Sequence, residues 1–92
     1  MRRVDEQPLD QRLAAARDAF LAAVAHHEAG RLDAAEAGYT QALALCPGRP
    51  SVLLNLAQLQ LARGQAPRLR ETLAPLLAGP EPEPDALRLW LQ

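Results

Sequence analysis

The residues whose types best suit chemistry stand together at positions 26 to 28, where the sequence reads His-His-Glu. Zinc bound to a helix takes histidines at positions i and i+4, because those two imidazoles project from one face. His26 and His27 are neighbours, so their side chains point about 100° apart, and the sequence contains no third histidine. We therefore expect no metal site and no bound cofactor. One histidine should be partly buried and the other should face solvent.

Cys46 and the carboxylate pair Glu81 and Glu83 are the remaining candidates for catalysis. Cys46 stands at the expected end of a helix, where the helix dipole disfavours the thiolate that a nucleophile needs. The two glutamates lie in the Pro-rich stretch PEPEP, which offers no pocket in which a general acid or base could work. No Gly-rich phosphate loop, serine elbow or CxxC pair occurs. We expect no enzymatic activity within these 92 residues.

Composition and charge narrow the class of protein further. Ala and Leu dominate the hydrophobic residues, Ile is absent and β-branched residues are few, which favours an all-α fold. A net charge of −1 with mixed signs provides no basic stripe for nucleic acid, and no run of about 20 apolar residues could span a membrane. All ten basic residues are Arg, which indicates a GC-rich bacterial gene. The single cysteine cannot form an internal disulfide and favours the cytoplasm, so we expect a cytoplasmic protein with neither nucleic acid nor membrane as a partner.

The elements that must position these side chains follow from the spacing of apolar residues. Residues 1–8 are polar and end at a proline, so we expect a flexible N-terminal arm. A helical domain, residues 9–92, should follow, because apolar residues then recur with a 3.6-residue period between glycines and prolines. The predicted helices cover residues 9–29, 32–45, 51–63, 66–78 and 85–92. Ser51 and Asp85 are the expected N-caps of the third and fifth helices.

A period of 34 residues runs through this pattern. Gly30 and Gly64 each follow the first helix of a pair, and Ala23 with Ala57 keeps the same offset. A repeated helix–turn–helix unit of this length is typical of stacked repeat proteins. Short connections make the helices of each pair antiparallel. The chain should therefore contain two helix pairs and the first helix of a third.

The first unit resembles the tetratricopeptide repeat family. Its small residues Ala23, Ala35 and Ala42, its aromatic Tyr39 and its helix-ending Pro47 stand where the family pattern has such residues. Small side chains let two antiparallel helices approach closely, and the ring fills the gap left between units. The resemblance implies an all-α fold in which antiparallel helix pairs stack as a short right-handed solenoid.

The second unit keeps less of the family pattern, since Leu69, Leu73 and Leu76 replace its small, aromatic and small residues. In this family the first helices of the units line a concave face that holds extended peptides. The resemblance therefore implies a protein–protein interaction scaffold whose partner is a protein or a peptide. Members that grip a C-terminal carboxylate do so with Lys, Asn and Arg. Here Phe20 and Val24 stand at the corresponding places of the first helix, so that clamp is absent.

The concave face that the resemblance implies draws on the first and third predicted helices. We expect a partner to contact Arg17, Phe20, Val24, His27, Leu54, Asn55, Gln58 and Leu61. The amide of Asn55 can donate and accept, so it either pairs with a peptide backbone or bonds only within its own helix pair. Phe20 either forms part of an apolar floor or belongs to the core between units.

Two alternatives concern the whole chain. In the first, the repeats are a structural or regulatory appendage that packs on an adjoining catalytic domain, such as a transferase, and have no partner-binding groove of their own. The second concerns residues 87–92, LRLWLQ, which form a short and uncapped apolar end. Either the chain is the N-terminal part of a longer protein, which we favour, or it self-associates through this end.

Overall fold

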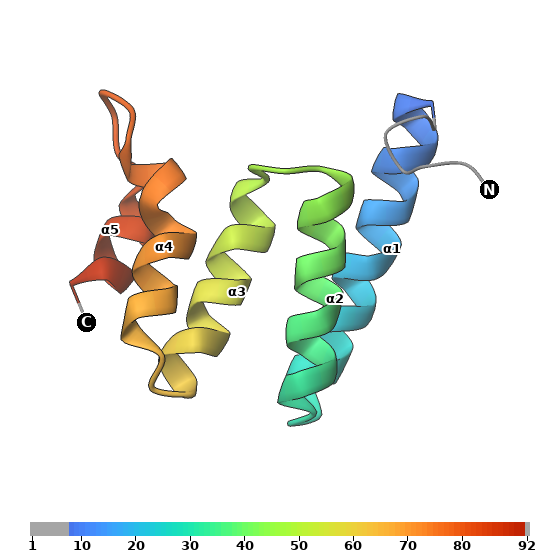
Figure 1. The fold of residues 1–92 in the computed structure, drawn as a ribbon, viewed down its shortest axis with the longest axis horizontal. Coiled ribbons are helices and arrows are strands. Elements are labelled where there is room, and N and C mark those ends of the chain that lie inside the picture. Colours follow the sequence, from blue (N-terminus) through green and yellow to red (C-terminus); the bar gives the residue numbers. More distant parts are fainter. Residues whose placement is uncertain (1–7, 92) are drawn as a thin grey trace.

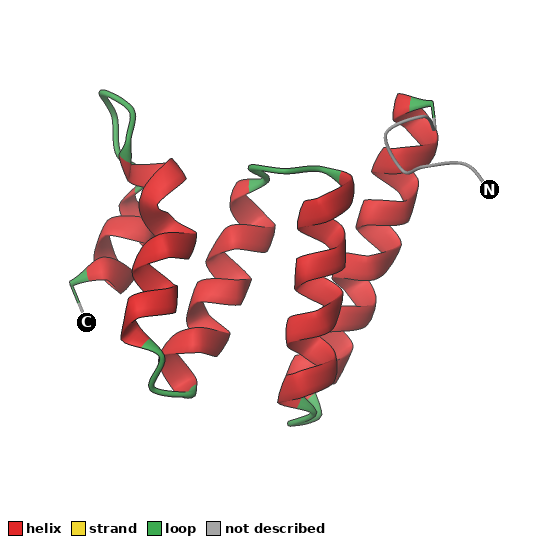
Figure 2. Ribbon diagram, in the orientation of Figure 1, coloured by secondary structure: helices red, strands yellow, loops and turns green. Residues whose placement is uncertain are grey.

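Five helices joined by short connections make up the described part of the chain (Figure 1). The computed structural model describes residues 8–91, so the expected arm apart from Pro8, and Gln92 at the end of the last predicted helix, lie outside the described residues. The helices are α1 (Leu9–Glu28), α2 (Leu32–Leu45), α3 (Pro50–Ala62), α4 (Ala66–Leu77) and α5 (Pro84–Trp90). Residues 8–91 contain no strand (Figure 2), which confirms the all-α prediction. Over the same range, no helix combines the length and apolar composition that crossing a membrane requires.

Consecutive helices run in opposite directions and are arranged in chain order (Figure 1). α1 packs on α2, and α3 packs on α4, as two antiparallel pairs, while α2 packs on α3 and so joins the pairs. α1 also contacts α3, and α3 contacts α5, so the first helices of successive units lie next to one another. The ends of the helices differ from the predicted ranges by at most two residues.

The predicted N-caps of α3 and α5 are wrong. α3 begins at Pro50, so Ser51 lies inside the first turn. α5 begins at Pro84, and its cap is Glu83, not Asp85: the Glu83 carboxylate accepts a hydrogen bond of 2.8 Å from the backbone N–H three residues later. Proline has its φ fixed near the helical value and has no N–H to satisfy, so it suits the first position of a helix. α3 and α5 therefore each begin one residue earlier in the chain than predicted.

The C-terminal ends of α1 and α3 repeat one hydrogen-bond pattern 34 residues apart. Gly30 has a φ of +80° and Gly64 a φ of +70°. At both helix ends, the N–H of the glycine donates to the carbonyl of the residue three positions before the glycine. The N–H of the residue after the glycine donates to the carbonyl five positions before that following residue. This is the Schellman motif, in which the residue after the helix takes the left-handed conformation that glycine favours. The backbone therefore repeats with the period seen in the sequence.

The first core forms where α1 and α2 approach each other closely. Gly38 of α2 lies against Ala23 of α1, since a Cβ atom built on Gly38 would be 2.7 Å from the Cβ of Ala23. Ala23, Ala35, Ala42 and Tyr39 have no exposed surface, as the close-packing interpretation of these residues requires. Tyr39 shares its core with side chains of α3, so the ring fills the space between the two units as expected.

α3 takes part in two cores and so carries the contact between the units. Its residues Val52, Leu56 and Leu59 pack in the first core with side chains of α1 and α2. A second core contains Ala57, Leu69, Leu73 and Ala86. Repeat units of this kind bury their apolar faces against their neighbours, so α3 makes the stability of each pair depend on the other.

Ion pairs also join the two units. Arg63, at the end of α3, pairs with Asp33 at 2.8 Å and with Glu36 at 3.2 Å, and Arg68 of α4 pairs with Glu36 at 3.3 Å. Pairs exposed to solvent contribute about 0–1 kcal/mol each. They therefore add to the contact that α3 makes through its buried side chains but do not replace it.

Candidate protein-interaction surface

Two hollows lie end to end between α1 and α3. On α1 their lining residues follow a stripe at three- and four-residue spacing from Leu13 to Glu28, and on α3 a second stripe runs from Ser51 to Gln58. Residues at this spacing share one face of a helix, so both hollows open on the same side. α1 and α3 also run in the same direction (Figure 1), which lets the two stripes lie alongside each other. We call this surface the α1/α3 groove.

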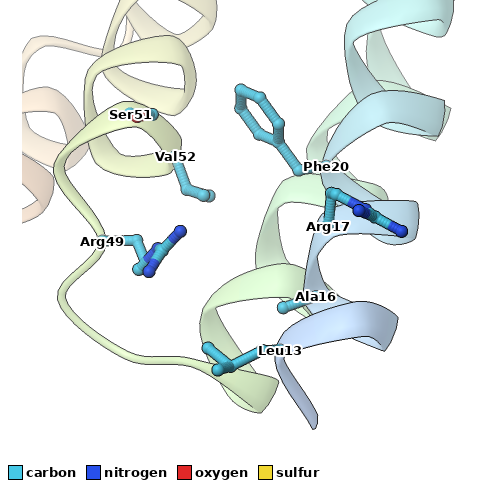
Figure 3. A pocket seen from close by; sticks show the side chains of 7 residues that line it. All are labelled: Leu13, Ala16, Arg17, Phe20, Arg49, Ser51 and Val52. Carbon is cyan, nitrogen blue, oxygen red and sulfur yellow. The ribbon is translucent and has the colours of Figure 1, made fainter. Parts of the chain in front are cut away.

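The first hollow, which we call the apolar hollow, lies toward the N-terminal ends of α1 and α3 (Figure 3). It is lined by Leu13, Ala16, Arg17, Phe20, Arg49, Ser51 and Val52. Its volume is about 110 Å³, below the roughly 300–1,000 Å³ of small-molecule sites, so it suits one side chain and not a cofactor. The ring of Phe20 lies 6.0 Å from that of Tyr39 and packs against the first core while it borders the hollow. Phe20 is therefore both a core residue and part of the groove floor.

The second hollow, the polar hollow, is lined by Val24, His27, Glu28, Tyr39, Asn55 and Gln58. His27 Nδ1 and the Tyr39 hydroxyl share a hydrogen bond of 3.0 Å, which fixes both rings at the base of the hollow. Asn55 Nδ2 donates to the Ser51 carbonyl at 2.8 Å, one turn earlier in α3. That bond uses one of the two amide N–H groups, and no residue from 8 to 91 bonds the amide oxygen. Asn55 thus bonds within its own helix and still keeps groups that can pair with a peptide backbone.

The Tyr39 hydroxyl stays uncharged at neutral pH. Burial raises its pKa above the ordinary value of 10.0, and the nearby carboxylate of Glu28 raises it further. Burial does so because a phenolate would lose its hydration, and Glu28 does so because two negative charges repel each other. The protonated hydroxyl is the form that can donate a hydrogen bond to the imidazole of His27.

The structure brings six of the eight expected contact residues to the groove. Arg17 and Phe20 border the apolar hollow, and four border the polar hollow: Val24, His27, Asn55 and Gln58. Leu54 borders neither, because it is half-buried against the second core. Leu61 is 37% exposed and also borders neither. A contact between a partner and any of the eight residues stays a prediction.

Five residues that line the apolar hollow are not among the eight expected contact residues: Leu13, Ala16, Arg49, Ser51 and Val52. Arg49 belongs to the turn before α3, whereas the resemblance directed attention to the helices alone. Val52 is a core residue that reaches the hollow with one edge. The spacing of residues could have identified one of them, because Leu13 precedes Arg17 by four positions and so lies on the same face of α1.

The other candidates for chemistry lie apart from any shared site. His26 accepts a hydrogen bond of 2.9 Å from Arg31 Nε and is half-buried, as is His27, so the expectation of one solvent-facing histidine is wrong. The thiol of Cys46 is buried and lies 3.8 Å from the carbonyl oxygen of Arg12, to which it donates. Within residues 8–91, no group of three or more His, Cys, Asp or Glu side chains is placed to hold a metal ion.

The C-terminal end exposes the apolar side chains on which self-association was predicted. Leu91 is 76% exposed. The residues at the equivalent position of the two preceding units, Ala57 and Ala23, stand 34 and 68 positions earlier and have no exposed surface. Trp90 is half-buried in the second core, and the Arg70 guanidinium lies 5.8 Å from its ring centroid. Association through this end stays a prediction.

The fold and the groove define a class of protein: a helical repeat protein built from stacked antiparallel pairs. The family model described as tetratricopeptide repeat matches residues 26–90, which is more than half of the chain and runs from the last turn of α1 through α5. The chain belongs to the tetratricopeptide repeat family. Comparison with curated proteins and with solved structures gave no match. Tetratricopeptide repeats generally mediate protein–protein interaction and are typically not catalytic.

Proposed function

We propose that this chain is an interaction domain that binds an extended segment of a protein partner along the α1/α3 groove. The succession of two hollows along the same two helices carries the proposal. From Leu13 to Glu28 the groove is about 22 Å long, at 1.5 Å per helical residue. An extended peptide advances about 3.3 Å per residue, so about seven residues of a partner would fill it.

The two hollows suit different parts of such a segment. The apolar hollow has the size of one side chain and can therefore distinguish one partner sequence from another. In the polar hollow, Asn55 and Gln58 carry amides that both donate and accept, which suits the N–H and C=O groups of a peptide backbone. Backbone contacts add affinity without regard to sequence, as they do in other modes of extended-peptide recognition.

The test is selection of peptides of about seven residues on the whole chain, followed by affinity measurements on two matched variants. Gln58→Arg places a long cation in the polar hollow, whereas Gln41→Arg makes the same change at an exposed residue of α2 outside the groove. Both positions are exposed, so neither change should disturb the core. We expect the selected peptides to lose at least about ten-fold in affinity, which corresponds to about 1.4 kcal/mol, with Gln58→Arg only.

A different result would locate the binding surface elsewhere. Selected peptides that bind Gln58→Arg as tightly as the unchanged chain do not occupy the groove. Peptides that lose affinity with Gln41→Arg bind the α2 side. A selection that yields no binder at all would contradict the proposed use of this groove for extended peptides.

A further inference from the structure

The apolar hollow combines a carbon-rich lining with two cationic side chains. Leu13, Phe20 and Val52 supply apolar surface, while Arg17 stands on α1 and Arg49 on the turn before α3. In Figure 3, Arg49 reaches toward the hollow from the α3 side and Arg17 lies on the α1 side. We propose that this hollow binds an apolar side chain of the partner that is flanked in sequence by Asp or Glu, whose carboxylates pair with the two arginines. The proposal deepens the proposed function and rests on it.

The positive charge at this hollow is available to a partner. The carboxylate of Asp18 is 4.0 Å from Arg17 Nε, at the outer limit of an ion pair, and the two side chains are 75% and 72% exposed. Arg49 is exposed and forms no ion pair within residues 8–91. Beside Arg49, the N-terminus of α3 adds a partial positive charge. An acidic segment is therefore attracted to this end of the groove, and a basic one is repelled.

The carboxylates should be side chains within a segment and not a chain terminus. The polar hollow follows the apolar hollow along the same faces of α1 and α3, so a bound segment can extend past the apolar residue toward it. Figure 3 shows Arg49 reaching toward the hollow, while Arg17 borders it from α1 with its guanidinium turned outward to solvent. An acid on one side of the bound apolar residue would meet Arg49, and an acid on the other side would meet the exposed Arg17. A chain terminus supplies a carboxylate on one side of the apolar residue only, and the segment could not continue into the polar hollow beyond it. The partner sequence that fits is acidic–apolar–acidic.

The test titrates the whole isotope-labelled chain with four short peptides and follows the backbone amide shifts, which detect even millimolar binding. The first peptide is Gly-Glu-Leu-Glu-Gly with both ends capped, the second carries Gln in place of Glu, and the third carries Arg. The fourth, Gly-Gln-Leu, ends in a free carboxylate. We expect the Glu peptide to shift the amides of residues 13–20, Arg49, Ser51 and Val52 and to bind about ten-fold more tightly than the Gln peptide. That advantage should shrink as salt screens the ion pairs.

Charge reversal separates recognition from a mere change in structure. The double variant Arg17→Glu with Arg49→Glu should prefer the Arg peptide to the Glu peptide. Arg31→Glu changes an exposed arginine at the other end of α1 and should leave the preference unchanged. Circular dichroism verifies that the variants keep their helices, which exposed positions should allow.

Several results would overturn the proposal: equal binding of the Glu and Gln peptides, tighter binding of the free carboxylate, shifts outside the apolar hollow, or no shift with any peptide. The wider function is tested separately. If selected peptides lack the acidic–apolar–acidic pattern but lose affinity with Gln58→Arg, the charge-based inference fails and the interaction groove stands.

Discussion

At the scale of single residues, the closest approach of α1 and α2 depends on the absence of one side chain. A Cβ on Gly38 would be 2.7 Å from Ala23 Cβ and 3.3 Å from the Ala19 carbonyl oxygen, so the helices would have to move apart. Overpacking costs about 1–3 kcal/mol, whereas replacing a glycine inside a helix by alanine gains about 1 kcal/mol. We expect Gly38→Ala to destabilise the protein by about 1 kcal/mol, measured by urea unfolding.

Gly79→Ala is the control for that substitution. Gly79 has no atom within 4 Å of the position its Cβ would take, and its φ is not positive. Its replacement should change the free energy of unfolding by less than about 0.5 kcal/mol. A Gly38→Ala protein as stable as the Gly79→Ala protein would show that the two helices separate without cost.

Tyr39 links the core to the groove, and its ionisation can be followed directly because it is the only tyrosine. Its pKa in the folded protein is raised by burial and by Glu28, so the unfolded chain loses this proton first as the pH rises. The stability that depends on Tyr39 is therefore complete below about pH 10 and falls as the pH rises from there through the folded pKa. Ultraviolet absorbance should show the hydroxyl titrating above 10 in the folded state.

Tyr39→Phe removes both the ionisation and the hydrogen bond to His27. We expect this variant to lose about 0.5–1.5 kcal/mol at neutral pH and to show a flatter decline in stability above about pH 10. A phenol that titrates at or below 10 in the folded chain would contradict the assigned environment of the ring.

At the scale of elements, α1 and α3 each end at a glycine that is required for its left-handed backbone conformation, and not because a side chain would lack room there. Gly64 has a φ of +70°, and no atom lies within 4 Å of the position that a Cβ atom would take there. A side chain in this conformation costs about 1–2 kcal/mol from backbone strain alone. Gly64→Ala should therefore lower the free energy of unfolding by about that amount, and Gly79→Ala again serves as the control. Equal thermal midpoints of the two variants would disprove the need for glycine at this helix end.

The extent of each helix could be predicted from the sequence, but the first residues of α3 and α5 could not. Apolar periodicity and the glycines gave helix ranges within two residues of the observed ones, because a buried face must recur every turn. The caps failed at Ser51 and Asp85, because Pro50 and Pro84 compete for the first helical position and local preferences alone do not rank the two. The packing role of Gly38 could not be predicted from the sequence either. A glycine inside a helix only indicates a weak helix former until the residue packed against it is known.

At the scale of the whole molecule, the groove was predictable only in part because it is made by separate elements. Arg17, Val24 and Asn55 lie on helices whose role the family resemblance identifies, and the structure places them along the groove. Arg49 comes from a turn, and it borders the same hollow as Arg17 and Leu13 because α3 packs against the first pair. That packing depends on side chains of three helices together, which no single stretch of sequence specifies.

The same packing makes the coupling between units measurable. Leu59 of α3 has no exposed surface and joins the core of the first pair, so it contributes to the contact between units. Tyr39 lies in that first core, whereas Trp90, the only tryptophan, packs against the second. Each of the two cores thus has its own spectroscopic probe. In a repeat protein the units unfold together as long as the interface free energy exceeds the difference between their own stabilities.

We expect Leu59→Ala to cost about 2–5 kcal/mol and to uncouple the two units, because it removes buried contacts between them. Tyrosine absorbance and tryptophan fluorescence should give one urea midpoint in the unchanged chain and two different midpoints in the variant. Leu61→Ala, the same substitution two positions later at a residue 37% exposed, should keep the two midpoints together. If Leu59→Ala lowers both midpoints equally, the coupling does not depend on this side chain, and the ion pairs of Arg63 become the contact to test next.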